Sequence, residues 1–340
     1  MSEILPESSE QFAIASGALS GANAVTSRKK QRRLLIWFIV LCLILATPGY
    51  YWFYLARPLG SGPAGPGVSR EPFQHTWSER NVLLLGWGDS ITAGFGVEIG
   101  YGYVERMLDN PPDEFDDMKG ICLRNVLPNI TVRNISISGS TSLQHREWLD
   151  TKLETQPEDV FGLVVMTTGG NDLIHSYGQR PPKEGAMYGA TLEQALPWIE
   201  SFRVRLDEMI VEMTQKFPGG CVIFLADIYD PTDDVGDAAS AMLPLWRDGI
   251  KILAKYNAIL RQAAVNHDNV FSVPLHATFL GHGTHCTQFW RKNYRWNDPT
   301  YWFGENLEDP NIRGFDAIRR IFLVEIAKER ERFNSKNQSL

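Results

Sequence analysis

The sequence predicts an α/β protein, in which one transmembrane helix precedes a three-layer α/β/α domain with a parallel sheet of about five strands. Short apolar runs alternate with longer amphipathic segments along most of the chain, which is the pattern of a parallel sheet covered by helices on both faces. The apolar runs end in Gly, Asp, Ser or Pro, where a strand gives way to a loop. Ahead of them lies a long stretch without any charged residue, which predicts the membrane span.

The membrane span is expected over residues 34–56, which carry no charge. A helix needs about 20 such residues to cross the hydrocarbon layer of a membrane, and the aromatic cluster Tyr50–Tyr54 is typical of a membrane interface. The basic block at 28–33 precedes the span, whereas only Arg57 follows it closely, so we expect a single-pass protein with a cytoplasmic N-terminus and an extracytoplasmic domain. A cleaved signal peptide is the alternative, although its apolar region is usually only about 7–15 residues long.

The flanking segments complete the division of the chain. Residues 1–33 are small and polar with a basic end, and we expect a disordered cytoplasmic tail there. Residues 57–75 include a stretch rich in Gly and Pro, which is typical of a linker, and the folded domain is expected over 76–335. The net charge is −7 and the basic residues of the tail lie ahead of the span, so the domain is acidic. An acidic domain argues against a nucleic-acid partner.

The elements of the domain follow one another in alternation. The expected strands are Asn81–Trp87, Ile130–Ser136, Phe161–Thr168, Cys221–Asp227 and Val270–Pro274. The expected helices lie around Tyr101–Asp109, Ser142–Lys152, Leu192–Lys216, Ala238–Asn266 and Asn311–Arg332. In open sheets of this kind ligands bind beyond the carboxyl ends of the strands, so the loops after the strands should carry the chemistry.

Three of these loops contain polar residues with a catalytic pattern. Asp89 and Ser90 follow the first strand between glycines, and a serine on such a tight turn projects its hydroxyl into the cleft. Gly139 follows the second strand, where a glycine lets the backbone approach a substrate closely. Asn171 follows the third strand, directly after two glycines. The sequence therefore predicts that these residues meet at one edge of the sheet.

These three blocks, in this order, resemble the first three blocks of the SGNH or GDSL-like hydrolases, a family named after its Ser, Gly, Asn and His residues. The resemblance covers the chain from around Asn81 to the last helix. It implies a flavodoxin-like sheet, hydrolysis of an ester without cofactor or metal, and Ser90 as the nucleophile. It also implies an oxyanion hole made by the backbone amides of Ser90 and Gly139 and by the side chain of Asn171, with Asp89 in a supporting role. Three donors that converge on one point stabilise a tetrahedral alkoxide.

The fourth block departs from the family pattern. The family has Asp-x-x-His-Pro-Asn before the last helix, whereas this chain has Asn306 at the Asp position and Asp309 at the His position. A carboxylate with an unperturbed pKa of about 4 is a weak base for a serine hydroxyl. Either the base has moved or the site is inactive.

Three histidines after the fifth strand offer a displaced base. They are His276, His282 and His285, in a loop that leaves the sheet at the same edge as Ser90. We favour His285 narrowly over His282 as the base and expect His276 to be a packing or rim residue. A nearby carboxylate would orient the imidazole by accepting its second N–H. The candidates for this orienting role are Asp309, Glu308 and Glu305.

The same loop allows other interpretations. His282, His285 and Cys286 are residue types that bind zinc, and a structural loop with hydrogen-bonded histidines is a further alternative. For the cysteines of the domain, an extracytoplasmic location permits at most one disulfide, which we expect between Cys122 and Cys286 because Cys221 opens an apolar strand.

The leading hypothesis is a membrane-anchored, extracytoplasmic serine hydrolase that cleaves an ester through an acyl-enzyme. Its substrate is a lipid or an O-acylated glycan, and the sequence does not choose between them. One alternative is an O-acyltransferase acting on a cell-surface polysaccharide, and another is a catalytically silent glycan-binding module with the same fold. An aromatic-rich insert at 289–303 and a loop at 177–188 are placed to cover the sheet edge or to shape the pocket.

Overall fold

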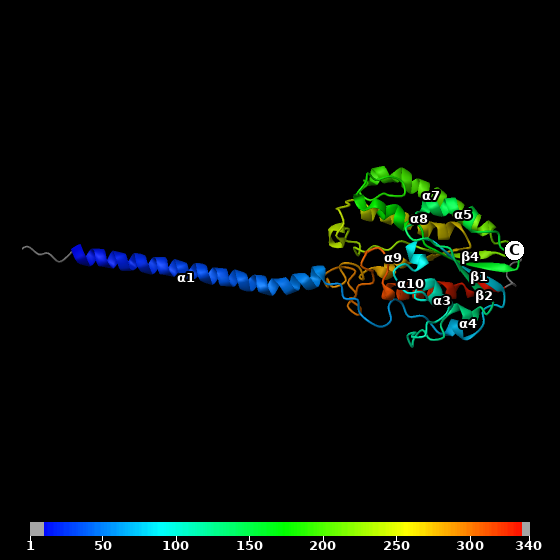
Figure 1. Cartoon of the computed structure of the whole chain (residues 1–340), viewed down its shortest axis with the longest axis horizontal. Coiled ribbons are helices and arrows are strands. Elements are labelled where there is room, and N and C mark those ends of the chain that lie inside the picture. Colours follow the sequence, from blue (N-terminus) through cyan, green and yellow to red (C-terminus); the bar gives the residue numbers. More distant parts are fainter. Residues whose placement is uncertain (1–9, 335–340) are drawn as a thin grey trace, which may run out of the picture. The chain divides into compact units, whose positions relative to one another are not determined.

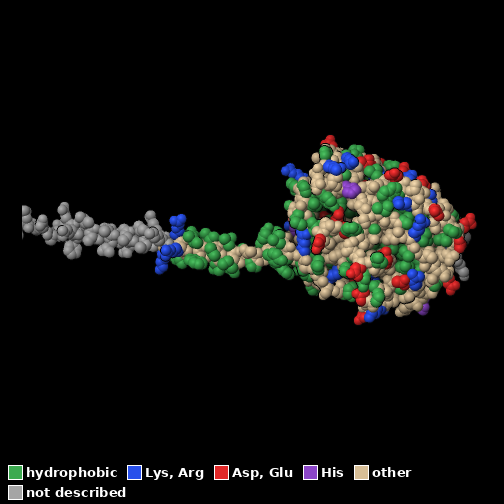
Figure 2. Space-filling view, viewed as in Figure 1, with side chains coloured by type: hydrophobic (Ala, Val, Ile, Leu, Met, Phe, Trp, Pro, Cys, Tyr) green, Lys and Arg blue, Asp and Glu red, His purple; other side chains and the backbone are tan. Residues whose placement is uncertain are grey.

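The computed structural model describes residues 10–334, with side chains from residue 30 onward, and divides the chain into two units with the boundary after Ala56. In the first unit, α1 runs over Glu10–Tyr50 and continues as a π-helix over Tyr51–Leu55. The stretch Lys30–Leu55 has 26 residues and a mean hydropathy of 2.1, so its length and composition suit a membrane crossing. Figure 2 shows the basic side chains that stand at the start of this apolar stretch; those described are Lys30, Arg32 and Arg33.

The structure differs from the sequence-based expectation for the tail. α1 begins at Glu10, so a helix occupies most of the segment expected to be disordered up to residue 33. The segment 10–33 contains five Ala, three Arg, two Lys and two Gln, which have high helix propensity. Residues 1–9 of the expected tail lie outside the described residues.

The second unit is built on a five-stranded sheet. Its strands are β1 (Asn81–Trp87), β2 (Ile130–Asn134), β3 (Val160–Met166), β4 (Cys221–Ala226) and β5 (Val270–Val273). All neighbouring pairs are parallel and the strand order is β2-β1-β3-β4-β5. This order is that of a flavodoxin-like sheet, so the predicted fold class is confirmed.

Helices cover both faces of this sheet. Figure 1 shows α5, α7 and α8 on one side and α3, α4 and α10 on the other. The first set comprises α5 (Ser142–Lys152), α7 (Leu192–Gln215) and α8 (Gly249–Asn266), and the second α3 (Tyr103–Leu108), α4 (Leu123–Val126) and α10 (Ile312–Lys328). Short helices at the strand ends are α2 (Ser90–Ala93), α6 (Gly170–Ile174) and α9 (Leu275–Phe279).

Single-turn 3₁₀-helices connect some of these elements. They are η2 (Glu71–Gln74), η3 (His175–Gly178), η4 (Ala238–Ala241) and η5 (Arg330–Phe333). Strand side chains alternate between the two faces of the sheet: Val82 and Leu84 pack with α10, whereas Leu83 and Leu85 pack with α7 and α8. The two layers of the core thus follow from the period of two along each strand.

The helix expected over 238–266 is interrupted. Here η4 ends at Ala241, Met242 has a left-handed φ of 58°, and α8 begins only at Gly249. Pro244 lies in the gap, and a proline disrupts the interior of a helix. The interruption creates a loop over 242–248, whose Leu243 and Trp246 line the cavity described below.

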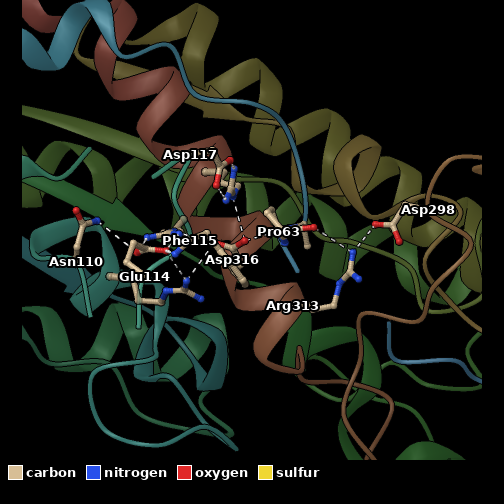
Figure 3. Close-up of polar contacts among 12 residues, drawn as sticks. Pro63, Asn110, Glu114, Phe115, Asp117, Asp298, Arg313 and Asp316 are labelled. Carbon is tan, nitrogen blue, oxygen red and sulfur yellow. Dashed lines mark hydrogen bonds and ion pairs between the residues drawn. The ribbon is translucent and has the colours of Figure 1, made fainter. Parts of the chain in front are cut away.

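The segment at 57–75, expected to be a linker, has a fixed path along α10. The backbone N–H of Ala64 donates to Asp316 Oδ2 at 3.0 Å, and the guanidinium of Arg313 donates to the carbonyl oxygens of Ser61 at 2.9 Å and Pro63 at 3.2 Å. Figure 3 shows Arg313 between Pro63 and Asp298, to which it also donates at 2.7 Å. This segment is therefore part of the folded domain.

A buried network of charges lies beneath this segment. Asp316 on α10 pairs with Arg319 at 2.7 Å, Arg320 at 3.0 Å and Arg106 on α3 at 3.4 Å. Glu114 pairs with Arg106 at 3.2 Å and with Arg319 (Figure 3). Burial alone would raise the pKa of Glu114, but the guanidinium groups of Arg319 and Arg106 outweigh it and lower that pKa below its ordinary value. The carboxylates therefore stay ionised and hold α3, α10 and the 57–75 segment together.

All four cysteines have free thiols. Cys122 and Cys286 are each buried in the core, so the expected disulfide between them is absent, and this prediction is wrong. Burial raises the pKa of the Cys286 thiol to about 12, which keeps it protonated and unreactive.

We predict that Glu114→Gln destabilises the domain by about 3–5 kcal/mol, because removing one partner leaves buried guanidinium charge uncompensated. The measurement is urea unfolding of the full chain in lipid nanodiscs, followed by tryptophan fluorescence. Asp116→Asn is the control, since the Asp116 carboxylate is exposed and pairs only with the exposed Lys119. Equal, small effects of both substitutions would contradict a structural role for the network.

Candidate functional site

Ser90 is held by a tight turn between β1 and α2. A Cβ at Gly88 would lie 2.3 Å from Thr167 Oγ1, so only glycine fits there. Asp89 caps α2 by accepting from the backbone N–H of Ile91 at 3.2 Å, and it also accepts from the Thr167 hydroxyl at 2.8 Å. Burial raises the pKa of Asp89 to about 6, although these two hydrogen bonds oppose the shift. Ser90, the first residue of α2, is half-buried and faces a cavity.

Gly139 and Asn171 come from the two neighbouring strand ends. Gly139 lies in an exposed turn after β2 with a left-handed φ of 76°. Asn171 lies in α6, which begins after Gly169 at a φ of 92°. One N–H of the Asn171 amide donates to the carbonyl oxygen of Ser140 at 2.9 Å, and its second N–H is left for a ligand. Asn171 and Ser90 line the same cavity.

A buried histidine fastens these two loops together. His145 on α5 bonds through Nε2 to Ser140 Oγ at 2.6 Å and through Nδ1 to Thr168 Oγ1 at 2.8 Å. Burial lowers the pKa of His145 to about 4, so the ring is neutral near pH 7 and serves as one donor and one acceptor. The sequence analysis missed this residue, because its place within a predicted helix says nothing of its partners.

The cavity beside Ser90 has a volume of about 150 Å³. It lies beyond the carboxyl ends of β1, β3 and β4, where open parallel sheets bind ligands. Its walls come from α6, the loop after β4, η4, the 242–248 loop and the start of α8. Most of the lining is apolar.

The three candidate bases point elsewhere. His276 bonds to the carbonyl oxygen of Ile228 and to Asp234, each at 3.0 Å. His282 stacks on Trp302 at 3.3 Å between ring centroids, and burial lowers its pKa to about 4. Neither histidine belongs to the described lining of the Ser90 cavity.

His285, the favoured candidate, also lies outside that lining. Its Nε2 bonds to Asp237 at 2.8 Å, and its backbone N–H donates to Asp233. Cys286 is buried in the core. Within the described residues with side chains, 30–334, no group of three or more His, Cys, Asp or Glu side chains is arranged to hold a metal ion.

The fourth block instead brings carboxylates to the cavity. Glu308 lines it together with Ser90, and its carboxylate accepts a hydrogen bond from the Tyr177 hydroxyl. The hydroxyl of Tyr229 donates to the backbone oxygen of Glu308 at 2.5 Å. Burial, together with the negative charges of Asp309 and Asp89, raises the pKa of Glu308 to about 7.

Asp309, the next residue along the chain, has different hydrogen-bond partners from Glu308. Its Oδ2 accepts from the side-chain amide of Asn306 at 2.6 Å, while its Oδ1 is buried and has no hydrogen-bond partner in the described chain. The charge of Asp309 thus raises the pKa of both Asp89 and Glu308, the two acids that line the cavity with Ser90.

The chain is similar to several solved structures at low identity. An acetylxylan esterase from Geobacillus stearothermophilus is 18% identical, with a TM-score of 0.47, covering 73% of this chain and 94% of that one. A member of the lipolytic protein G-D-S-L family from Veillonella parvula is 14% identical, with a TM-score of 0.42, covering 71% and 96%. The psychrotrophic esterase EstA from a Pseudoalteromonas species is 15% identical, with a TM-score of 0.40, covering 73% and 98%.

No curated protein matches the sequence. The model of one protein family, the GDSL-like Lipase/Acylhydrolase family, does match, over residues 87–300. This range contains Ser90, Gly139 and Asn171 and ends before the atypical fourth block at Asn306. Since the match covers well over half of the chain, the protein belongs to the GDSL-like lipase/acylhydrolase family and is a hydrolase acting on ester bonds.

Proposed function

We propose that the protein is a membrane-anchored, extracytoplasmic serine esterase with Ser90 as its nucleophile. Ser90 Oγ attacks the ester carbonyl, the alcohol leaves, and water then hydrolyses the acyl-enzyme. The backbone amides of Ser90 and Gly139 and the side chain of Asn171 stabilise the oxyanion. The observation that carries this proposal is that Ser90 and Asn171, from different strand ends, line one cavity at the carboxyl edge of the sheet.

The proton of Ser90 needs an acceptor, and Glu308 suits this role. It lines the same cavity as Ser90, whereas the three candidate histidines are bonded to other partners. A carboxyl with a pKa raised to about 7 is a far better base near neutral pH than an ordinary one. In this scheme Glu308 takes the proton from Ser90 Oγ and gives it to the leaving alkoxide. It then takes a proton from the attacking water and returns it to Ser90 Oγ as the acid product leaves. The Tyr177 hydroxyl orients the carboxylate, as an orienting group does in a triad.

The apolar stretch of the first unit and its flanking charges support the proposed extracytoplasmic location of the domain. The Lys30–Leu55 stretch can cross a membrane by its length and composition, and basic residues stand on one side of it. The positive-inside rule then favours a cytoplasmic N-terminus. The esterase domain would act on the outer side, tethered close to the membrane surface.

Ser90→Ala should abolish labelling of the full chain by a fluorophosphonate probe and lower turnover of p-nitrophenyl esters by about 10⁴-fold or more. Ser201→Ala, an exposed serine on α7, should label and turn over normally. Labelling of the Ser90→Ala protein at the normal rate would remove Ser90 from its role. Absence of labelling and turnover in the native protein would support the silent binding module.

Glu308→Gln should lower kcat/KM by about 10²–10⁴-fold, because the neutral amide cannot accept the serine proton. Glu98→Gln, an exposed glutamate in the loop after α2, should have no effect. The base must be ionised, so kcat/KM of the native protein should fall as the pH is lowered through about 7.

Substitution of the candidate histidines tests the alternative base in the same assay. His282 titrates at about 4, so a His282 base would keep the activity down to that pH. If His282→Ala or His285→Ala is as inactive as Ser90→Ala while Glu308→Gln stays active, the base is the displaced histidine and not Glu308.

Protease added outside intact spheroplasts should digest the domain from residue 57 onward, and protection should be seen only for an N-terminal epitope tag. In cells that receive no protease, the same tag should be found on the full-length protein. Protection of the domain until lysis would reverse the topology, and loss of the tag from the full-length band would indicate a cleaved signal peptide.

A further inference from the structure

We infer that the cavity beside Ser90 binds the acyl chain of the ester, and that the preferred acyl group is an unbranched aliphatic chain of medium length and not acetyl. This inference rests on the proposed nucleophile Ser90 and specifies the substrate class of the same site. It also distinguishes a lipid ester from an O-acetylated glycan, because an O-acetyl group has only two carbon atoms.

The cavity that Ser90 lines is also lined by apolar side chains from several elements. They are Leu173, Tyr188, Ala241, Leu243, Trp246 and Leu253. Leu173 on α6, Ala241 on η4 and Leu253 on α8 are all buried. These residues lie on separate segments of the chain, so the apolar surface is a product of the fold. An apolar surface of this kind gains free energy by removing methylene groups from water.

The polar atoms of two aromatic lining residues, Tyr188 and Trp246, are bonded to backbone carbonyl groups. The Tyr188 hydroxyl donates to the carbonyl oxygen of Pro244 at 2.7 Å, and the Trp246 indole N–H donates to that of Ala190 at 2.8 Å. Both residues therefore offer ring surface to the cavity. A sugar needs hydrogen-bond partners for its hydroxyls, and these two side chains have given theirs to the backbone.

Acidic residues in the same lining are occupied as well. The carboxylate of Asp230 accepts from the backbone N–H groups of Thr232 at 2.9 Å and Asp234 at 2.8 Å, and also from the Thr232 hydroxyl. The same lining contains Ser90, Asn171 and Glu308. The cavity thus combines the proposed reacting groups with a mostly apolar lining, as an ester with an alkyl tail requires.

The volume of the cavity limits the length of the acyl group that it can hold. The cavity of about 150 Å³ equals the volume of an engineered apolar cavity, about 150 Å³, that takes up benzene. It therefore accepts about six carbon atoms, and an acetyl group would leave most of it unfilled. Each buried methylene contributes about a four-fold gain in kcat/KM, so a six-carbon acyl group should exceed acetyl by about 10²-fold.

The test is a series of p-nitrophenyl esters whose acyl groups range from acetate to palmitate. The full-length protein is assayed in lipid nanodiscs. We expect kcat/KM to rise by about 10²-fold from acetate to hexanoate and to rise no further beyond octanoate. Ala241→Leu fills the cavity and should move the optimum to shorter chains, whereas Leu253→Ala enlarges it and should move the optimum to longer ones. Ala254→Leu, on the exposed face of α8, is the matched control.

Opposite shifts in the two cavity variants cannot come from a general loss of folding, which would lower all esters alike. A flat profile, or acetate as the best substrate with Ser90-dependent turnover, would overturn the acyl-chain inference and leave the proposed esterase intact. If no ester is turned over, the proposed esterase fails. In that case the inference is tested by calorimetry, which measures the binding of octanoate to the Ser90→Ala protein and to the Ala241→Leu protein. Binding that Ala241→Leu abolishes supports the apolar site, and no binding to the Ser90→Ala protein overturns it.

Discussion

The direction of the five strands is the constraint on which the rest of the domain depends. Because all five are parallel, their carboxyl ends meet at one edge of the sheet. Ser90, Gly139 and Asn171 come from the ends of three adjacent strands, β1, β2 and β3. Residues far apart in the sequence are therefore collected at one edge by the strand directions, and contacts such as Thr167 with Asp89 and Asn171 with Ser140 hold the loops together. Glycines such as Gly88 and Gly169 allow the backbone turns next to Ser90 and Asn171, which line the cavity.

The site is unusual in its charges. In place of an imidazole it gathers three carboxyl groups, and burial together with mutual repulsion raises the pKa of Asp89 to about 6 and that of Glu308 to about 7. Perturbed carboxyl groups in a cavity are characteristic of catalytic sites, although structural ones are perturbed too. What distinguishes Glu308 is its position, since it lines the cavity with Ser90 and its carboxylate is oriented by Tyr177.

The segment after residue 56 is ordered on the domain. The hydrogen bonds from Ala64 to Asp316 and from Arg313 to Ser61 and Pro63 fix this segment along α10, so little of it is left as a free linker.

The sequence by itself determined the elements and the order of the site. The apolar runs are strands whose boundaries match the expected ones within two residues, and Ser90, Gly139 and Asn171 lie in the loops that directly follow three of them. Only the tertiary structure decided which side chains face Ser90. The direction in which His282 or His285 points depends on Trp302 and Asp237, contacts that no spacing within their own loop encodes. Likewise, Asp316 meets Ala64 across 252 residues, and Leu173, Ala241 and Leu253 form one apolar wall from three elements. Period and loop position are local properties of the chain, whereas packing partners are set by how the layers close on one another.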